Sequence, residues 1–239
     1  DFNSICSTGQ DIVFCRNGFS INNERAMIFD ITQIYDYTPC IYNPAEIEQV
    51  KKKVKILKTL SQEFLLNKNN NSDIDTFISN KFSEFMERAI KFYKSDVIPP
   101  ALPPGADELI GLGRGLTPSG DDLLAGFMTA MVFLILYIAK KCAARLEANP
   151  SPIDVFTTTF LNFVYENSSR THAISKQMLK TAALGEGPKV MTDLMENIFS
   201  EHMEQSRLEQ NLRKLLSTGS TSGADMAQGI YTAFTAILY

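Results

Sequence analysis

The sequence is poor in the residues that build disulfide frameworks and zinc sites. Its 239 residues include four cysteines, no Cys-x-x-Cys pair and two histidines, His172 and His202. So few cysteines in a chain of this length argue against a disulfide framework, and the lack of paired ligands argues against a structural zinc site. We therefore expect the cysteines to be reduced thiols and the protein to be cytoplasmic.

An excess of positive charge is also missing. Lys and Arg number 23 against 27 Asp and Glu, which gives a net charge of −4. Proteins that bind nucleic acids neutralise phosphates with basic patches, so we expect no nucleic-acid partner. With 44% hydrophobic and 21% charged residues, the composition is that of a globular protein and excludes a disordered chain.

One stretch, residues 123–139, contains no charged residue. At about 1.5 Å rise per residue, a helix of this length is at the lower limit for crossing a bilayer. Two aspartates precede it and two lysines follow it, and flanks of opposite sign suit a helix dipole inside one soluble domain. We expect a buried central helix and no membrane partner, with a membrane span as the alternative.

The order of sequence patterns along the chain predicts an α+β, predominantly α fold. Residues 1–42 contain short apolar runs separated by Asn-rich turn signals, which predict a small β-rich N-terminal part. From residue 44 onward apolar residues recur with helical spacing, so residues 43–239 are expected to form a helical domain around the apolar helix. Helices are expected at 44–66, 72–93, 119–148, 153–166, 169–184, 188–200, 202–216 and 222–238.

The sequence repeats one of its own segments. Residues 119–131 read SGDDLLAGFMTAM and residues 222–234 read SGADMAQGIYTAF, with six matched positions. Gly126 and Gly229 each begin a small-xxx-small pattern, which lets two helix backbones approach closely. We therefore predict that the two helices pack as a pseudo-symmetric pair whose N-terminal loops meet at one site.

Each copy opens with Ser-Gly-x-Asp, which has the spacing of a capping box and assigns Asp122 and Asp225 first to capping. Asp121 is different, because its counterpart in the second copy is Ala224. A carboxylate beyond what capping requires, at the end of a glycine-rich loop, is a candidate general base or cation ligand.

The glycine-rich loop at 111–122 precedes the apolar helix, and its echo lies at 219–225. Glycines allow close backbone approach to a ligand, and the amides of a helix N-terminus suit phosphate or carboxylate. The loop is therefore interpreted as an anion cradle through 113–119, or as a site where Asp121 and Asp122 hold Mg²⁺ against a phosphate. A tight turn into a buried helix is the structural alternative. The pattern matches neither a P-loop nor a Rossmann fingerprint.

A second polar cluster, SSRTHAIS, occupies residues 168–175. Arg170 suits a carboxylate or phosphate, and His172 suits a hydrogen-bond donor or proton carrier. The alternative is a helix start with a surface ion pair. His202 and the lysines at 51–53 are expected to face solvent.

Four motifs together resemble one known family: GLGRGLTPSGDDLLAG (111–126), RTHAIS (170–175), LKTAALGEG (179–187) and GSTSGADMAQGI (219–230). The family was long described as a domain of unknown function, and it includes the AllH-type subunit of oxamate carbamoyltransferase from anaerobic allantoin breakdown. Two positions depart from the family pattern.

These departures are Arg114, where the family carries proline, and Ser220, where it often carries histidine. The resemblance implies carbamoyl transfer between carbamoyl phosphate and oxamate, which gives oxalurate and phosphate. It also implies companion subunits or a homo-oligomer. A non-catalytic scaffold subunit and a Mg²⁺-dependent nucleotide or phosphoester enzyme are the competing hypotheses.

Such a reaction needs donors on the carbamoyl oxygen and the leaving phosphate, and a group that moves a proton. The expected catalytic residues are Asp121, Ser119 and His172. The expected substrate-binding residues are Gly113, Arg114, Gly115, Thr117, Gly120, Arg170, Thr171, Ser222, Gly223 and Asp225. No cofactor is certain, and Mg²⁺ at Asp121 and Asp122 is the speculative metal assignment.

Overall fold

The computed structural model describes residues 41, 44–67, 73–93, 105–141, 152–202 and 204–239, together with the backbone of three short strands. The chain divides into two compact units, Asp1–Tyr37 and Thr38–Tyr239. In the first unit the strands are antiparallel in the order β1 (Ile12–Cys15), β2 (Gly18–Ile21) and β3 (Glu24–Ile28).

The predicted α+β class, with its small β-rich N-terminal part, is wrong. Of the residues described from 41 onward, about 80% are helical and none belongs to a strand, so the fold is predominantly helical. The strands of the first unit have four or five residues each, and nothing of their side chains is described. Short apolar runs with turn signals report local extended backbone, and they do not show whether enough strands gather to make a core.

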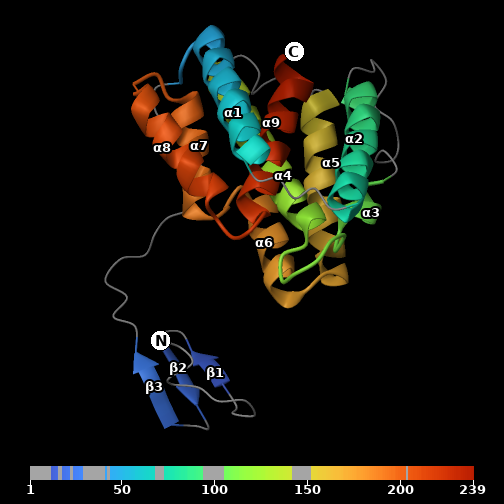
Figure 1. Ribbon diagram of the computed structural model, residues 1–239, viewed down its shortest axis with the longest axis vertical. Helices are drawn as coiled ribbons and strands as arrows, with labels where there is room; N and C mark the ends of the chain where they lie inside the picture. Colours follow the sequence, from blue (N-terminus) through green and yellow to red (C-terminus); the bar gives the residue numbers. More distant parts are fainter. Residues whose placement is uncertain are drawn as a thin grey trace. The chain divides into compact units, whose positions relative to one another are not determined.

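The second unit is built from helices (Figure 1). They are α1 (Ile47–Asn67), α2 (Asp73–Tyr93), α3 (Ala106–Leu109), α4 (Ser119–Lys141), α5 (Pro152–Asn167), the 3₁₀ turn η3 (Ser168–Arg170), α6 (Ala173–Ala183), α7 (Lys189–Phe199), α8 (Gln205–Leu216) and α9 (Ser222–Leu238). In Figure 1, α4 and α9 lie at the centre, with α1, α7 and α8 on one side and α2, α3 and α5 on the other.

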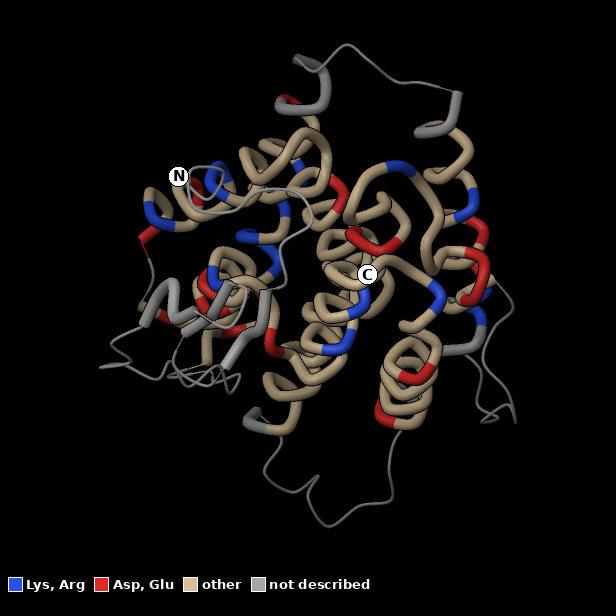
Figure 2. Tube along the Cα trace, turned by 90° about the horizontal axis from the view of Figure 1, so that it is seen from below, with Lys and Arg blue, Asp and Glu red and all other residues tan. Residues whose placement is uncertain are grey.

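The apolar helix α4 is the core of this unit, as predicted. By length and composition it could cross a membrane, yet 72% of its apolar window is buried by the surrounding helices. Seen from below, Figure 2 shows Lys and Arg residues spread over the helices of this unit, whereas α4 carries no charged residue from 123 to 139. A helix that is apolar all round has to be buried on all sides, which explains its central place.

Aromatic residues fix the helices around α4. Phe127 of α4 meets Phe85 of α2 and Phe160 of α5, with ring centroids 6.4 and 5.5 Å apart. On the opposite side of α4, the ring centroids of Phe199 of α7 and Tyr137 of α4 lie 5.0 Å apart. Such pairs add roughly 0.5–1.5 kcal/mol each beyond their buried area.

Two local predictions need correction. The helix expected over 169–184 begins at Ala173, after η3, because the two residues before it, Thr171 and His172, have extended backbone. The basic run at 51–53 is not an entirely solvated face, because Lys53 is half-buried and its Nζ donates to the carbonyl oxygens of Asn197 and Ser200. These carbonyls end α7, where a lysine can satisfy groups that the helix leaves unpaired.

Candidate functional site

The two repeated segments form the helix pair α4–α9, as the sequence predicts. A Cβ atom added to Gly126 would overlap the carbonyl oxygen of Met226, and one added to Gly229 would overlap that of Leu123. Each glycine therefore admits the backbone of the other helix. This contact brings the N-termini of α4 and α9 together, and the hydroxyls of Thr117 and Ser222 lie 3.1 Å apart across them.

The loop at 111–118 leads into α4 with its backbone partly open to solvent. Gly113 and Gly115 have φ values of 128° and 90°, which side chains rarely adopt. A Cβ on Gly115 would meet nothing within 4 Å, so the loop is open at that point. Within the described residues, the amides of 113–117 donate to no carbonyl or side chain. These donors are available to water or to an anion.

Asp121 is a buried anchor. Its Oδ1 accepts from the Gly111 amide at 2.7 Å, and its Oδ2 accepts from the hydroxyls of Thr171 and Ser175. The residue is fully buried. One carboxylate thus joins the loop, the segment after η3 and α6, and this favours a positioning role over that of an exposed general base.

Asp122 lies next to this anchor, and its surroundings are different. It is fully buried, and no donor of the described residues reaches either of its carboxylate oxygens with hydrogen-bond geometry. The predicted capping box is therefore wrong for Asp122. In the second copy, the residue at the N-cap of α9 is Thr221 rather than Ser222, and its side chain makes no capping hydrogen bond.

Burial raises the pKa of the Asp122 carboxyl from its ordinary 3.8 to about 7. The nearby negative charges of Asp225 and Asp121 contribute to this rise, while the hydroxyls of Ser222 and Thr117 oppose it. We call Thr117, Asp122, Ser222 and Asp225 the inter-helix cluster. Every side-chain polar atom in it is an oxygen, and the part of the chain that is described holds no group of three or more His, Cys, Asp or Glu residues suited to a metal.

The second polar segment lies against the glycine-rich loop, as the substrate-wall interpretation requires. A Cβ on Gly111 would lie 3.1 Å from the carbonyl oxygen of Arg170. The Arg170 side chain is exposed and lies 3.9 Å from the Asp107 carboxylate, which is a long, screened ion pair. His172 is also exposed, at the N-cap of α6, where its side chain makes no capping bond.

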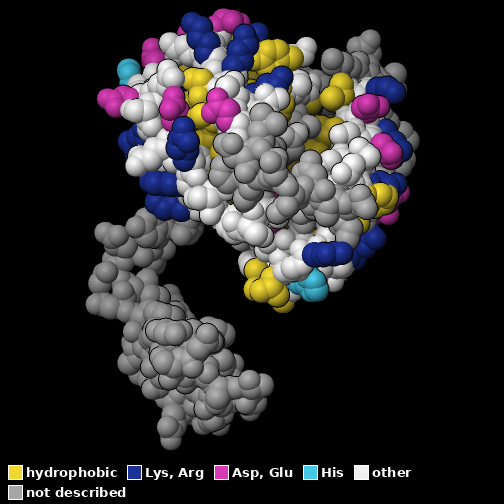
Figure 3. Space-filling view, in the orientation of Figure 1, with side chains coloured by type: hydrophobic (Ala, Val, Ile, Leu, Met, Phe, Trp, Pro, Cys, Tyr) yellow, Lys and Arg dark blue, Asp and Glu magenta, His cyan; other side chains and the backbone are white. Residues whose placement is uncertain are grey.

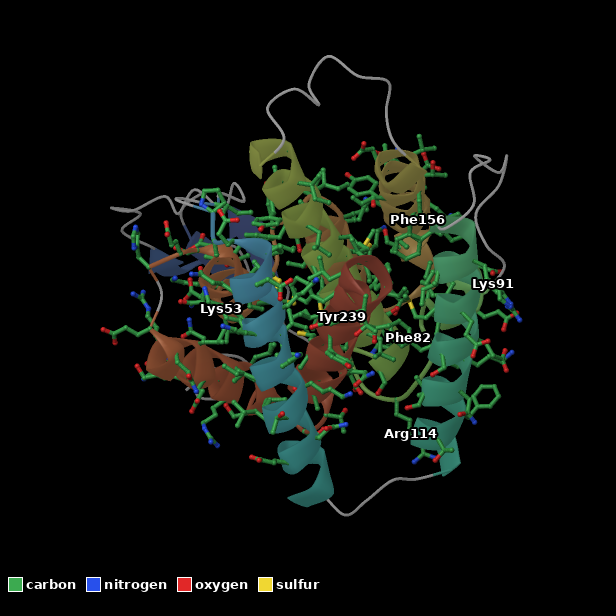
Figure 4. All side chains as sticks on the ribbon, turned by 90° about the horizontal axis from the view of Figure 1, so that it is seen from above. Lys53, Phe82, Lys91, Arg114, Phe156 and Tyr239 are labelled. Atoms are coloured by element: carbon green, nitrogen blue, oxygen red, sulfur yellow. The ribbon has the colours of Figure 1, made fainter. Side chains whose placement is uncertain are left out.

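The rim of the loop, which we define as Arg114, Leu116 and Ile174, exposes both charged and hydrophobic side chains. Arg114 is exposed, and Figure 4 labels it beside α2. Leu116 and Ile174 are exposed large hydrophobic residues, at 67% and 56%. Figure 3 shows hydrophobic, basic and histidine side chains at the lower edge of the helical unit, where Figure 1 places α6.

Other residues predicted to bind substrate serve the packing of the helices instead. Gly120 and Gly223 are buried where a Cβ would overlap the carbonyl oxygens of Leu109 and Leu215, so neither opens onto the loop. Ser119 is the half-buried first residue of α4. The structure therefore gathers the loop, Arg170 and the inter-helix cluster at one end of α4 and α9.

Two features escaped the sequence interpretation. One is the closeness of Asp225 to Asp122, whose charge acts on Asp122 together with that of Asp121. The repeated segment could have indicated it, because the two aspartates stand at the same position of the two copies. The other is the use of Ser175 and Thr171 as donors to Asp121. No local sequence pattern predicts these hydrogen bonds, because the donors lie 50 residues or more from Asp121 in the sequence.

Comparison with known proteins gives one finding. A family model described as oxamate carbamoyltransferase subunit AllH matches residues 109–234, which is more than half of the chain and includes the loop, α4, α6 and most of α9. No curated protein and no solved structure matches the chain.

Proposed function

Because the chain belongs to the family of oxamate carbamoyltransferase subunit AllH, we propose that it is a carbamoyltransferase subunit that binds a small anionic substrate at its glycine-rich loop. The observation that carries the proposal is the run of amides at 113–117, which have no acceptor among the described residues. Consecutive free amides at a helix start form an anion-binding concavity.

The substrates that the family name suggests are small anions with carbonyl groups. Oxamate carries a carboxylate, and carbamoyl phosphate carries a phosphate that leaves during transfer. Preorganised donors act most strongly where charge develops, so we assign the loop amides to the leaving phosphate or the substrate carboxylate. The exposed guanidinium groups of Arg114 and Arg170 flank the loop and add positive charge.

A subunit of this enzyme has companion subunits, and the loop rim suits contact with one of them. Leu116 and Ile174 expose apolar area beside the loop. We propose that a companion covers this rim and excludes water from the loop during transfer.

The test compares two variants of the loop that have side chains of the same size and differ only in charge. Gly115→Asp places a carboxylate in the open part of the loop, and Gly115→Asn places a neutral side chain of the same size there. Both variants carry the same backbone strain, so only charge separates them. Carbamoyl phosphate, oxamate and phosphate are titrated into the full chain by calorimetry, with a chelator present to remove metals.

We expect at least one of these anions to bind the parent chain and Gly115→Asn. We expect Gly115→Asp to bind it about tenfold more weakly, which corresponds to about 1.4 kcal/mol of repulsion. Arg207→Ala at the exposed start of α8 lowers the net charge by one away from the loop, as Gly115→Asp does within it, and serves as the control for net charge. Equal affinities of the Asp and Asn variants, or no anion binding at all, would contradict the proposal.

A further inference from the structure

Among the described residues the Asp122 carboxylate lacks a hydrogen-bond partner, and the hydroxyls of Ser222 and Thr117 offset its burial only in part. It is fully buried, and neither oxygen receives a hydrogen bond from the described residues. The charges that act on it are those of Asp225 and Asp121, which are both negative. Burying an acceptor without a partner costs free energy, and burying it among like charges costs more. The missing element is a group that supplies positive charge.

The neighbours of Asp122 in the inter-helix cluster are oxygen donors. Thr117 contributes a hydroxyl from the loop, Ser222 contributes one from the start of α9, and these two oxygens are 3.1 Å apart. Asp225 adds a carboxylate one turn into α9. Two carboxylates with hydroxyls are hard ligands, which prefer Mg²⁺, Mn²⁺ or Ca²⁺ to softer metals.

We propose that the inter-helix cluster binds one divalent cation of the magnesium type between the carboxylates of Asp122 and Asp225. The cation supplies the charge that Asp122 lacks and removes the repulsion between the two aspartates. Asp121 is not a ligand, because its two oxygens already accept three hydrogen bonds. This assignment differs from the adjacent pair Asp121 and Asp122 that the sequence suggested.

The α4–α9 contact determines where Asp122 and Asp225 lie relative to each other. Gly126 and Gly229 allow the backbones to touch, so Asp122 and Asp225, at equivalent positions of the two copies, are held on neighbouring helix starts. Mg²⁺ commonly takes one or two carboxylates and fills its other positions with water or a substrate phosphate. The cluster fits this pattern without a third acidic residue.

Cation binding does not depend on the proposed anion site, so the test uses Mn²⁺ alone. The full chain, freed of metals, is titrated with Mn²⁺ at about pH 8, and free Mn²⁺ is followed by electron paramagnetic resonance. We expect one saturable site per chain with a dissociation constant of about 1 mM or lower. Asp122→Asn should weaken binding about tenfold or more, whereas Asp193→Asn, a surface carboxylate on α7, should leave it unchanged.

Ser222→Ala is the second variant, because it removes one hydroxyl ligand while every carboxylate stays in place. We expect it to weaken Mn²⁺ binding severalfold, and thermal unfolding of each variant confirms that it is folded. The proposal is overturned if the parent chain shows no saturable site below about 1 mM, or if Asp122→Asn and Ser222→Ala both bind as the parent does. Anion titrations in chelator report on the loop separately, so either site can fail alone.

Discussion

At the third position of the shared segment, α4 carries Asp121 and α9 carries Ala224, and both side chains are buried. Ala224 needs no partner. The buried Asp121 carboxylate needs hydrogen-bond donors, and the Gly111 amide and the hydroxyls of Thr171 and Ser175 donate to it. One substitution between the two copies therefore decides whether a helix start is only packed or is also tied to two distant segments.

The next pair of positions shows what the copies keep in common. Asp122 and Asp225 occupy the fourth position of the two segments, and the close contact of α4 with α9 brings them together. The shared residues thus build the helix pair and its two carboxylates. Asp121, which is not shared, ties Gly111 of the glycine-rich loop, Thr171 and Ser175 of α6 to the start of α4, and α9 has no equivalent carboxylate at that position.

The largest expected effect comes from breaking the helix contact on which the comparison rests. Gly229→Val places a branched side chain against the backbone of α4, where a Cβ alone would already overlap the Leu123 carbonyl oxygen. Backbone cannot yield as a flexible side chain does, so we expect a loss of more than about 5 kcal/mol, or failure to fold. Urea unfolding followed by circular dichroism measures it.

Gln228→Val is the matched control, because Gln228 is the exposed neighbour of Gly229 on the same helix. It introduces the same side chain away from α4, and we expect a change within about 0.5 kcal/mol. Comparable losses in the two variants would mean that helix propensity, rather than the α4–α9 contact, controls stability.

The second largest effect is expected at the third position of the shared segment, where α4 carries Asp121 and α9 carries Ala224. Asp121→Ala makes α4 resemble α9 there, and it leaves two hydroxyls and one amide without their acceptor. Each unsatisfied buried donor costs roughly 1–3 kcal/mol, so we expect about 5 kcal/mol of lost stability in the same unfolding assay. Asp107→Ala removes an exposed carboxylate and should cost far less. A folded, stable Asp121→Ala that has lost carbamoyl transfer would instead support the general-base role.

The sequence predicted local features and repeated ones better than those that depend on distant segments. The echo predicted the α4–α9 contact because small residues at matched positions have a direct steric meaning. Lys53 was misplaced because a run of lysines suggests solvent, while its acceptor on Asn197 lies 144 residues away. The hydrogen bonds of Asp121 could not be predicted, because the hydroxyls of Thr171 and Ser175 lie 50 and 54 residues away in the sequence. The expected β-rich part was wrong as a statement of fold class, because short apolar runs indicate local extended backbone and do not show whether strands build a core.

The smallest of the three effects concerns Asp122, at the fourth position of the shared segment. It is measured as the pH dependence of the free energy of unfolding. In the folded state the pKa of Asp122 is about 7, above its ordinary value of 3.8. Between these values the folded chain holds a proton that the unfolded chain has released, so this group lowers stability as pH rises from about 4 to 7. Above pH 7 the loss is complete and amounts to at most roughly 4 kcal/mol.

Asp122→Asn removes this dependence, because an amide does not titrate. In chelator, we expect the variant and the parent to unfold alike near pH 4 and the variant to become more stable by up to roughly 4 kcal/mol near pH 8. Other carboxylates contribute equally to both chains and cancel in the difference. Asp193→Asn, the surface control, should show no such trend. A difference that stays constant across this range would mean that Asp122 keeps its ordinary pKa and that its burial is compensated by a group not yet identified.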